Sequence, residues 1–123
     1  MKQLFLVFIG GGIGSTARYA IGKWLNSSTA NMPYGTLFAN VLGSLLIGII
    51  LGYSLKSNVL SQQTTLLLAT GFCGGFTTFS TFAYESQNFL KNGDYLSFGM
   101  YALGSFALAL IAVFIGLWIA KNL

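Results

Sequence analysis

Four long apolar stretches, separated by short polar segments, constrain this chain more than any other feature. They run from about Leu4 to Leu25, Thr36 to Leu55, Thr64 to Leu90 and Tyr95 to Ala120. About 18 apolar residues are enough for a helix to cross a bilayer core of about 30 Å. We therefore expect an all-α membrane protein with four transmembrane helices, formed by residues 1–123 as a single domain. The first stretch is long for a signal peptide, and we expect it to be retained.

The scarcity of charged residues supports the same fold class. Only 7% of the residues are charged and 54% are apolar, whereas a soluble domain has roughly a quarter charged residues. The outer surface is therefore expected to face lipid, and the protein is expected to be a multi-pass protein of the cell membrane (plasma or inner).

The composition also excludes several classes of function. The chain has no His, one Cys and two acidic residues, Glu85 and Asp94. Most catalytic sites and zinc sites need groups that this composition lacks, so we expect no enzymatic activity. The six basic residues are spread along the sequence, which argues against nucleic-acid binding.

The positions of the basic residues leave the orientation open. With four spans, Lys2, Lys56 and Lys121 lie on one side of the membrane, and Lys23, Lys91 and Arg18 lie toward the other. An excess of Lys and Arg normally marks the cytoplasmic side. Here the two sides carry nearly equal numbers of basic residues, so neither side has a clear excess. One interpretation is that a weak bias still fixes the orientation. The other is that the chain inserts both ways and pairs head to tail.

The third stretch contains a segment that is poorly suited to a regular helix. Gly74 and Gly75 are adjacent, and Thr77 and Thr78 follow closely. Glycine lowers helix propensity by roughly 1 kcal/mol relative to Ala. We expect the third helix to break between Gly74 and Thr78, near the middle of the membrane. Broken backbone at that depth is tolerated inside protein or beside a water-filled cavity, where its free carbonyls and amides can bind ions.

Polar and aromatic residues recur at helical spacing around this segment. Phe79 and Phe82 share a face beside the hydroxyls of Ser80 and Thr81. The second stretch has a row of small and polar residues four apart that includes Asn40, and the fourth stretch has Ser97, Tyr101 and Ser105 at the same spacing. Hydroxyl and amide donors and phenyl edges suit an anion, but hydroxyl and carbonyl oxygens also suit cations. Helix packing accounts for part of each row.

Residues 71–82 also carry a known signature. They read GFCGGFTTFSTF and are followed by Glu85, a pattern that closely resembles the third helix of the Fluc/CrcB fluoride channels. The similarity extends to Gly11, Gly12, Gly14, Arg18 and Tyr19, to residues 35–44, and to four spans over the whole length. It implies an antiparallel, dual-topology homodimer in the membrane lipid, with two pores that export fluoride passively and so relieve its toxicity.

The resemblance further implies roles for individual residues. Main-chain carbonyls of Gly74 and Thr77 from each subunit would hold a structural Na⁺ at the dimer interface. The residues that it implies for the ion pore are Asn40, Phe79, Phe82, Ser80, Thr81, Tyr101 and Ser105. Some relatives carry a hydroxyl where this chain has Ala109, so the extent of the polar track in the fourth helix stays open.

Two other functions remain as alternatives. Small multidrug-resistance transporters are also short, four-helical and often dual-topology, but they resemble one another in an acidic residue of the first span. Here the first span has none, and Glu85 lies late in the third. A purely structural or regulatory membrane subunit would need neither the hydroxyl rows nor a helix break.

Overall fold

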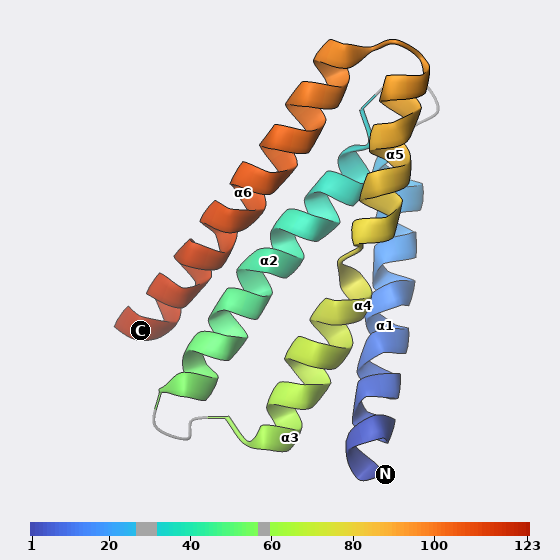
Figure 1. Ribbon diagram of the computed structural model, residues 1–123. Coiled ribbons are helices and arrows are strands. Elements are labelled where there is room, and N and C mark those ends of the chain that lie inside the picture. Colours follow the sequence, from blue (N-terminus) through green and yellow to red (C-terminus); the bar gives the residue numbers. More distant parts are fainter. Residues whose placement is uncertain (27–31, 57–59) are drawn as a thin grey trace.

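The computed structural model describes residues 1–26, 32–56 and 60–123, and all regular structure within these residues is helical (Figure 1). Helix α1 spans Lys2–Leu25, α2 spans Tyr34–Leu55 and α6 spans Tyr95–Asn122. Between α2 and α6 the chain forms α3 (Gln62–Thr65), the π-helix η1 (Leu66–Cys73), α4 (Gly74–Phe76) and α5 (Phe79–Lys91).

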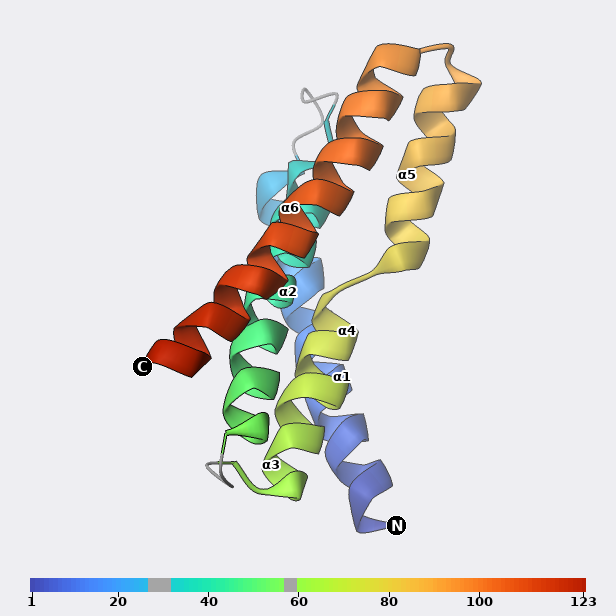
Figure 2. The ribbon, with the colours of Figure 1, turned by 60° about the vertical axis from the view of Figure 1, so that its left-hand side comes forward.

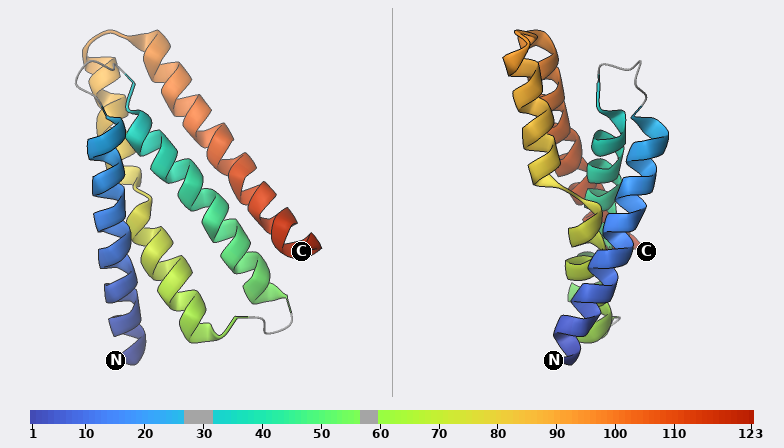
Figure 3. Two further views of the ribbon diagram at one scale, coloured as in Figure 1. Left: turned by 180° about the vertical axis from the view of Figure 1, so that it is seen from behind. Right: turned by 90° about the vertical axis from the view of Figure 1, so that its right-hand side faces the viewer.

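Four of the described helical segments are long and apolar enough to cross a membrane. Each of the four stretches expected from the sequence lies within one of them: residues 2–25, 34–55, 62–91 and 95–122. The expected all-α architecture with four membrane spans is therefore confirmed. Seen from behind, the helices form a fan that runs from α1 through η1 and α2 to α6 (Figure 3).

Helical geometry in the third segment ends at Phe76 and resumes at Phe79. Thr77 has φ −90° and ψ 157°, and Thr78 has φ −150° and ψ 122°, so both are extended. Within the expected interval from Gly74 to Thr78, the two glycines remain helical and the two threonines are extended. Threonine accounts for the difference, because its branched side chain favours extended backbone and because the Thr78 hydroxyl accepts a hydrogen bond from the Thr81 amide, which starts the next helix.

The two sides of this interruption contact different helices. The chain from Gln62 to Phe76 packs mainly on α1, whereas α5 packs mainly on α6. Figure 2 shows α5 displaced sideways from α4, with the extended residues crossing between them. The third segment thus links the α1 side of the molecule to the α6 side.

Glycines let the helix backbones touch at two places. A methyl group at Gly10 or Gly14 would collide with main-chain atoms of η1 and α4, and one at Gly75 would collide with Gly11. The α2–α6 contact is similar, because a methyl at Gly48 would meet the Val113 carbonyl and one at Gly116 would meet the Leu45 carbonyl. Close backbone approach through small residues is how helices pack when lipid removes the hydrophobic driving force.

The outward faces of the helices carry large apolar side chains. Phe8, Leu103, Phe114 and Trp118 are among many exposed residues of this kind. In water such a surface would be unstable, since monomeric soluble proteins rarely expose large contiguous apolar patches. The surface is suited to lipid.

Candidate functional site

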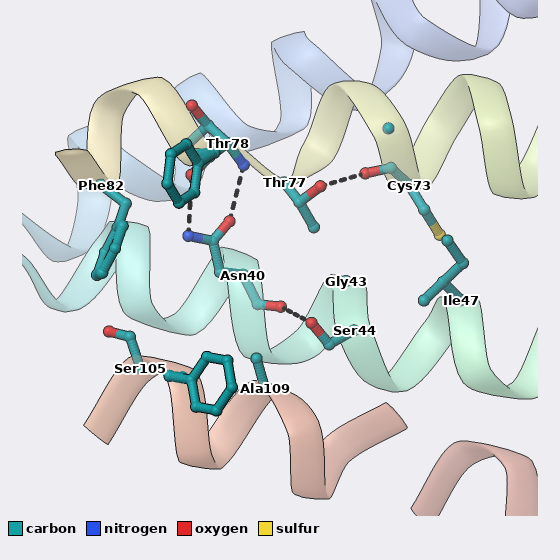
Figure 4. A pocket seen from close by; sticks show the side chains of 13 residues that line it. Asn40, Gly43, Ser44, Ile47, Cys73, Thr77, Thr78, Phe82, Ser105 and Ala109 are labelled. Carbon is teal, nitrogen blue, oxygen red and sulfur yellow. Dashed lines mark hydrogen bonds between the residues drawn. The ribbon is translucent and has the colours of Figure 1, made fainter. Parts of the chain in front are cut away.

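A cavity of about 400 Å³ lies beside the interruption of the third segment. Its wall combines α2, the end of the helix that stops at Phe76, the start of α5 and the middle of α6 (Figure 4). The lining residues are Asn40, Gly43, Ser44, Ile47, Cys73, Gly74, Thr77, Thr78, Phe79, Phe82, Ser105, Phe106 and Ala109.

Asn40 holds the extended backbone at Thr78 with both ends of its amide. Its Oδ1 accepts from the Thr78 N–H at 2.8 Å, and its Nδ2 donates to the Thr78 carbonyl at 3.1 Å (Figure 4). The side chain thus supplies the pair of bonds that a neighbouring strand would supply to an extended residue. Ser44 donates to the Asn40 carbonyl at 2.7 Å and so lies one helical turn further along the same wall.

The threonines use their own hydroxyls to satisfy part of the broken backbone. The Thr77 hydroxyl and the Thr77 amide both donate to the Cys73 carbonyl, at 2.9 and 3.0 Å. In a continuous helix the Thr78 amide would donate to Gly74 and the Thr81 amide to Thr77. Here these amides donate to Asn40 and to the Thr78 hydroxyl instead. The carbonyls of Gly74 and Thr77 therefore lack their helical donors.

Aromatic rings extend from the cavity along α5 and α6. The ring centroids of Phe79 and Phe82 are 5.9 Å apart, and those of Phe82 and Tyr101 are 5.1 Å apart, with tilted planes in both pairs. Phe82 is partly buried, whereas the side chain of Phe79 is 80% exposed in the single chain. The two phenylalanines therefore share one helix face but differ in their surroundings.

Ser105 brings a hydroxyl to the α6 wall of the cavity. The residue is only 8% exposed, and its Oγ has no hydrogen-bond partner among the residues that the structure describes. A buried polar atom without a partner is uncommon in proteins and calls for a specific explanation. Ser105 lies on the Phe82 side of the wall, and Ala109 lies nearer to Asn40 and Ser44 (Figure 4).

Some of the residues singled out from the sequence line the cavity, and the others lie elsewhere on α5 and α6. Asn40, Phe79, Phe82 and Ser105 line the cavity together with Gly74 and Thr77. Tyr101 is buried next to Phe82, and Ser80 is exposed with its hydroxyl 3.3 Å from that of Thr78. Thr81 faces a second cavity of about 360 Å³, which is also lined by Arg18, Lys23 and Thr36 among others.

Glu85 is a polar centre that the list of expected pore residues did not include. It accepts hydrogen bonds from the Thr36 hydroxyl at 2.9 Å and from the Tyr101 hydroxyl at 2.7 Å. These bonds tie α5 to α2 and α6. The available signal was its charge, because an ionisable residue within a membrane span is usually functional and paired.

Side chains offer little for a metal ion. The described ranges contain no cluster of three or more His, Cys, Asp or Glu residues. A cation at this site would be held by main-chain oxygens, and the carbonyls of Gly74 and Thr77, which lack their helical donors, offer the oxygen ligands that a small monovalent ion prefers.

Comparison with known proteins finds one family and many relatives. Residues 5–117 match the family described as CrcB-like protein, Camphor Resistance (CrcB). A protein of Phocaeicola vulgatus named fluoride-specific ion channel FluC is 44% identical over 98% of this chain and 100% of its own length. Proteins with the same name from Gloeothece citriformis and Leptospira interrogans are 46% and 44% identical, and cover 99% and 98% of this chain and 99% and 96% of their own lengths.

The double hydrogen bond of Asn40 gives a first prediction. In Asn40→Leu the side chain keeps its approximate volume, but the Thr78 N–H and C=O lose their partners, at a cost of about 1–3 kcal/mol for each buried group left unsatisfied. We expect a lower melting temperature and faster hydrogen exchange at the Thr78 amide. Ser44→Ala is the matched control, since it removes a hydroxyl from the same wall without touching Thr78. Unchanged exchange at Thr78 in Asn40→Leu would show that other contacts hold the extended backbone.

Proposed function

Because the chain belongs to the CrcB-like protein family, we propose that it is a fluoride channel that lets fluoride leave the cell passively across the plasma or inner membrane. The relatives supply the identity of the ion, since all three named above are fluoride-specific channels. The resemblance seen in residues 71–82 is confirmed by the family match. The relatives are channels, and we propose that this chain likewise has no enzymatic activity.

The cavity beside the interruption has the chemistry that a small anion requires. The observation that carries the proposal is the buried Ser105 hydroxyl, which lies on a residue of the cavity wall and has no partner among the described residues. Phe79 and Phe82 can turn ring edges, the positive part of the aromatic quadrupole, toward an anion. Helix α5 begins at Phe79 beside the cavity, and the N-terminus of a helix favours negative charge.

We assign the polar residues to successive parts of the ion path. Asn40 lines the cavity and uses one N–H of its amide on Thr78, and an amide has a second N–H that can donate to an ion. Tyr101 and Ser105 continue the path along α6. Ser80 and Thr81 would serve the side of α5 that turns away from the cavity, because Thr81 lines the second cavity.

The functional unit is proposed to be an antiparallel homodimer with two pores. The nearly equal distribution of Lys and Arg between the two sides supports insertion in both orientations. The interruption divides residues 62–91 into halves of similar length, so it would lie near the middle of the bilayer. Gly74 is exposed in the single chain, as an interface residue would be.

At the centre of that dimer, the carbonyls of Gly74 and Thr77 from both subunits would hold a structural Na⁺. The sodium ion would balance the partial negative charge of four converging oxygens. The support from this chain is that the Gly74 and Thr77 carbonyls lack their helical donors, and that few charged side chains are present to compete for the ion.

The function is tested by ion efflux from proteoliposomes. We expect the purified protein to release fluoride, monitored with a fluoride electrode, and to retain chloride. A cationic dye is included as a third solute. Proton-coupled movement of the dye would favour the small multidrug-resistance class, and no movement of any of the three solutes would favour a structural subunit.

The same assay tests the two phenylalanines. Phe82→Ile and Phe79→Ile keep apolar bulk but remove the ring edge, and we expect each to reduce fluoride flux at least about tenfold, which corresponds to a barrier increase of about 1.4 kcal/mol. Phe114→Ile, at an exposed position of α6 outside the cavity, should conduct like the parent. Normal flux in both cavity variants would show that Phe79 and Phe82 only pack against their neighbours and do not contribute to the ion path.

The dual orientation is tested by labelling from each side of the membrane. Asn92→Cys, made in a Cys73→Ala chain so that it is the sole thiol, should react with an impermeant reagent from both faces of sealed vesicles. Added lysines in one set of loops should bias insertion and lower flux, and an oppositely biased partner should restore it. Labelling of Asn92→Cys from a single face only would rule out antiparallel pairing.

A further inference from the structure

The Gly75 carbonyl, in the last turn before the interruption, is held by side chains of another helix. Arg18 donates to it through Nε at 3.0 Å, and Ser15 donates through its hydroxyl at 3.4 Å. Both donors belong to α1. The last turn is therefore tied to α1 by two side chains as well as by packing.

The sequence of α1 explains why this contact forms. Gly11, Ser15 and Arg18 lie on one face of the helix because they are four and three residues apart. Gly11 and Gly75 approach so closely that a methyl group at Gly75 would collide with the Gly11 backbone. Because neither glycine has a side chain, the Gly75 carbonyl comes within hydrogen-bond distance of Ser15 and Arg18.

The contact is also electrostatically favourable. The helix that runs from Gln62 to Phe76 ends here, and the C-terminus of a helix carries partial negative charge on its free carbonyls. Arg18 is a permanent cation placed at that end. Arg18 donates to the Gly75 carbonyl. The Cys73 carbonyl accepts from the Thr77 hydroxyl, and the Asn40 side chain binds both the amide and the carbonyl of Thr78.

We infer that Arg18 is a positioning residue for the proposed sodium site. By holding Gly75 against α1, Arg18 fixes the last helical turn so that Gly74 stays on the exposed side of the helix, with its carbonyl and that of Thr77 free to bind a cation. This inference rests on the proposed function and adds a residue that does not touch the ion. It assigns Arg18 to the backbone of the interruption rather than to the anion path.

The test measures sodium-dependent protection of the interruption. Hydrogen exchange of the amides of residues 74–78 is followed in the full-length protein in lipid, as Na⁺ replaces N-methylglucamine. In the parent we expect Na⁺ to slow exchange. In Arg18→Met, which keeps the length of the side chain but loses its donors, at least ten times more Na⁺ should be needed for half of the protection. Ser15→Ala should shift the midpoint in the same direction by less, and it covers the case in which Arg18→Met does not fold.

A matched control and a flux measurement separate the possible outcomes. Lys91→Met removes an exposed cation at the far end of α5 and should keep the parental Na⁺ midpoint. At saturating Na⁺, the fluoride concentration for half-maximal flux should be the same in Arg18→Met as in the parent. An unchanged Na⁺ midpoint together with a raised fluoride requirement would overturn the inference and place Arg18 on the anion path.

The proposed function can fail separately from this inference. If the parent releases no fluoride from proteoliposomes, the channel assignment is wrong whatever the exchange data show. If the parent conducts fluoride but its exchange is indifferent to Na⁺, the sodium site and the positioning role of Arg18 are both wrong, and the channel assignment stands.

Discussion

The requirement that buried backbone groups find hydrogen-bond partners governs this structure. Lipid offers no hydrogen-bond partners. An extended pair of residues inside a membrane span therefore persists only if other parts of the protein supply these partners. Here Asn40 from α2 supplies both partners of Thr78, Arg18 and Ser15 from α1 supply those of Gly75, and the threonine hydroxyls supply others. The helices around the interruption are arranged so that these side chains reach it.

Two helix ends of opposite polarity meet at the interruption. The helix that stops at Phe76 presents the negative end of its dipole, and the helix that starts at Phe79 presents the positive end. The dipoles of one short segment of chain therefore favour a cation on one side and an anion on the other. In a protein with only 7% charged residues, the proposed sodium ion and the proposed fluoride path would then be parts of one electrostatic arrangement.

Hydropathy predicted the membrane spans closely, because span length is set by the thickness of the bilayer and apolar runs are easily recognised. The detail of the interruption was harder to predict. Glycine propensity pointed to Gly74 and Gly75, but Gly75 packs against Gly11 and stays helical, while Thr77 and Thr78 become extended. Which way each hydroxyl points depends on tertiary packing, so Thr81 and Ser105 could not be assigned to different cavities from spacing alone. Glu85 was visible in the sequence, but its partners Thr36 and Tyr101 come from distant helices.

The glycine contact between α2 and α6 has a consequence for how the protein is made. Gly48 and Gly116 are far apart in the chain, and α6 follows all the other described helices. During synthesis α2 enters the membrane well before the helix that packs on it. Because α6 also carries Ser105 and Ala109 of the cavity wall, a nascent chain has no complete cavity until α6 is inserted. The cavity is therefore a product of the packing of all its walls, and no earlier part of the chain forms it alone.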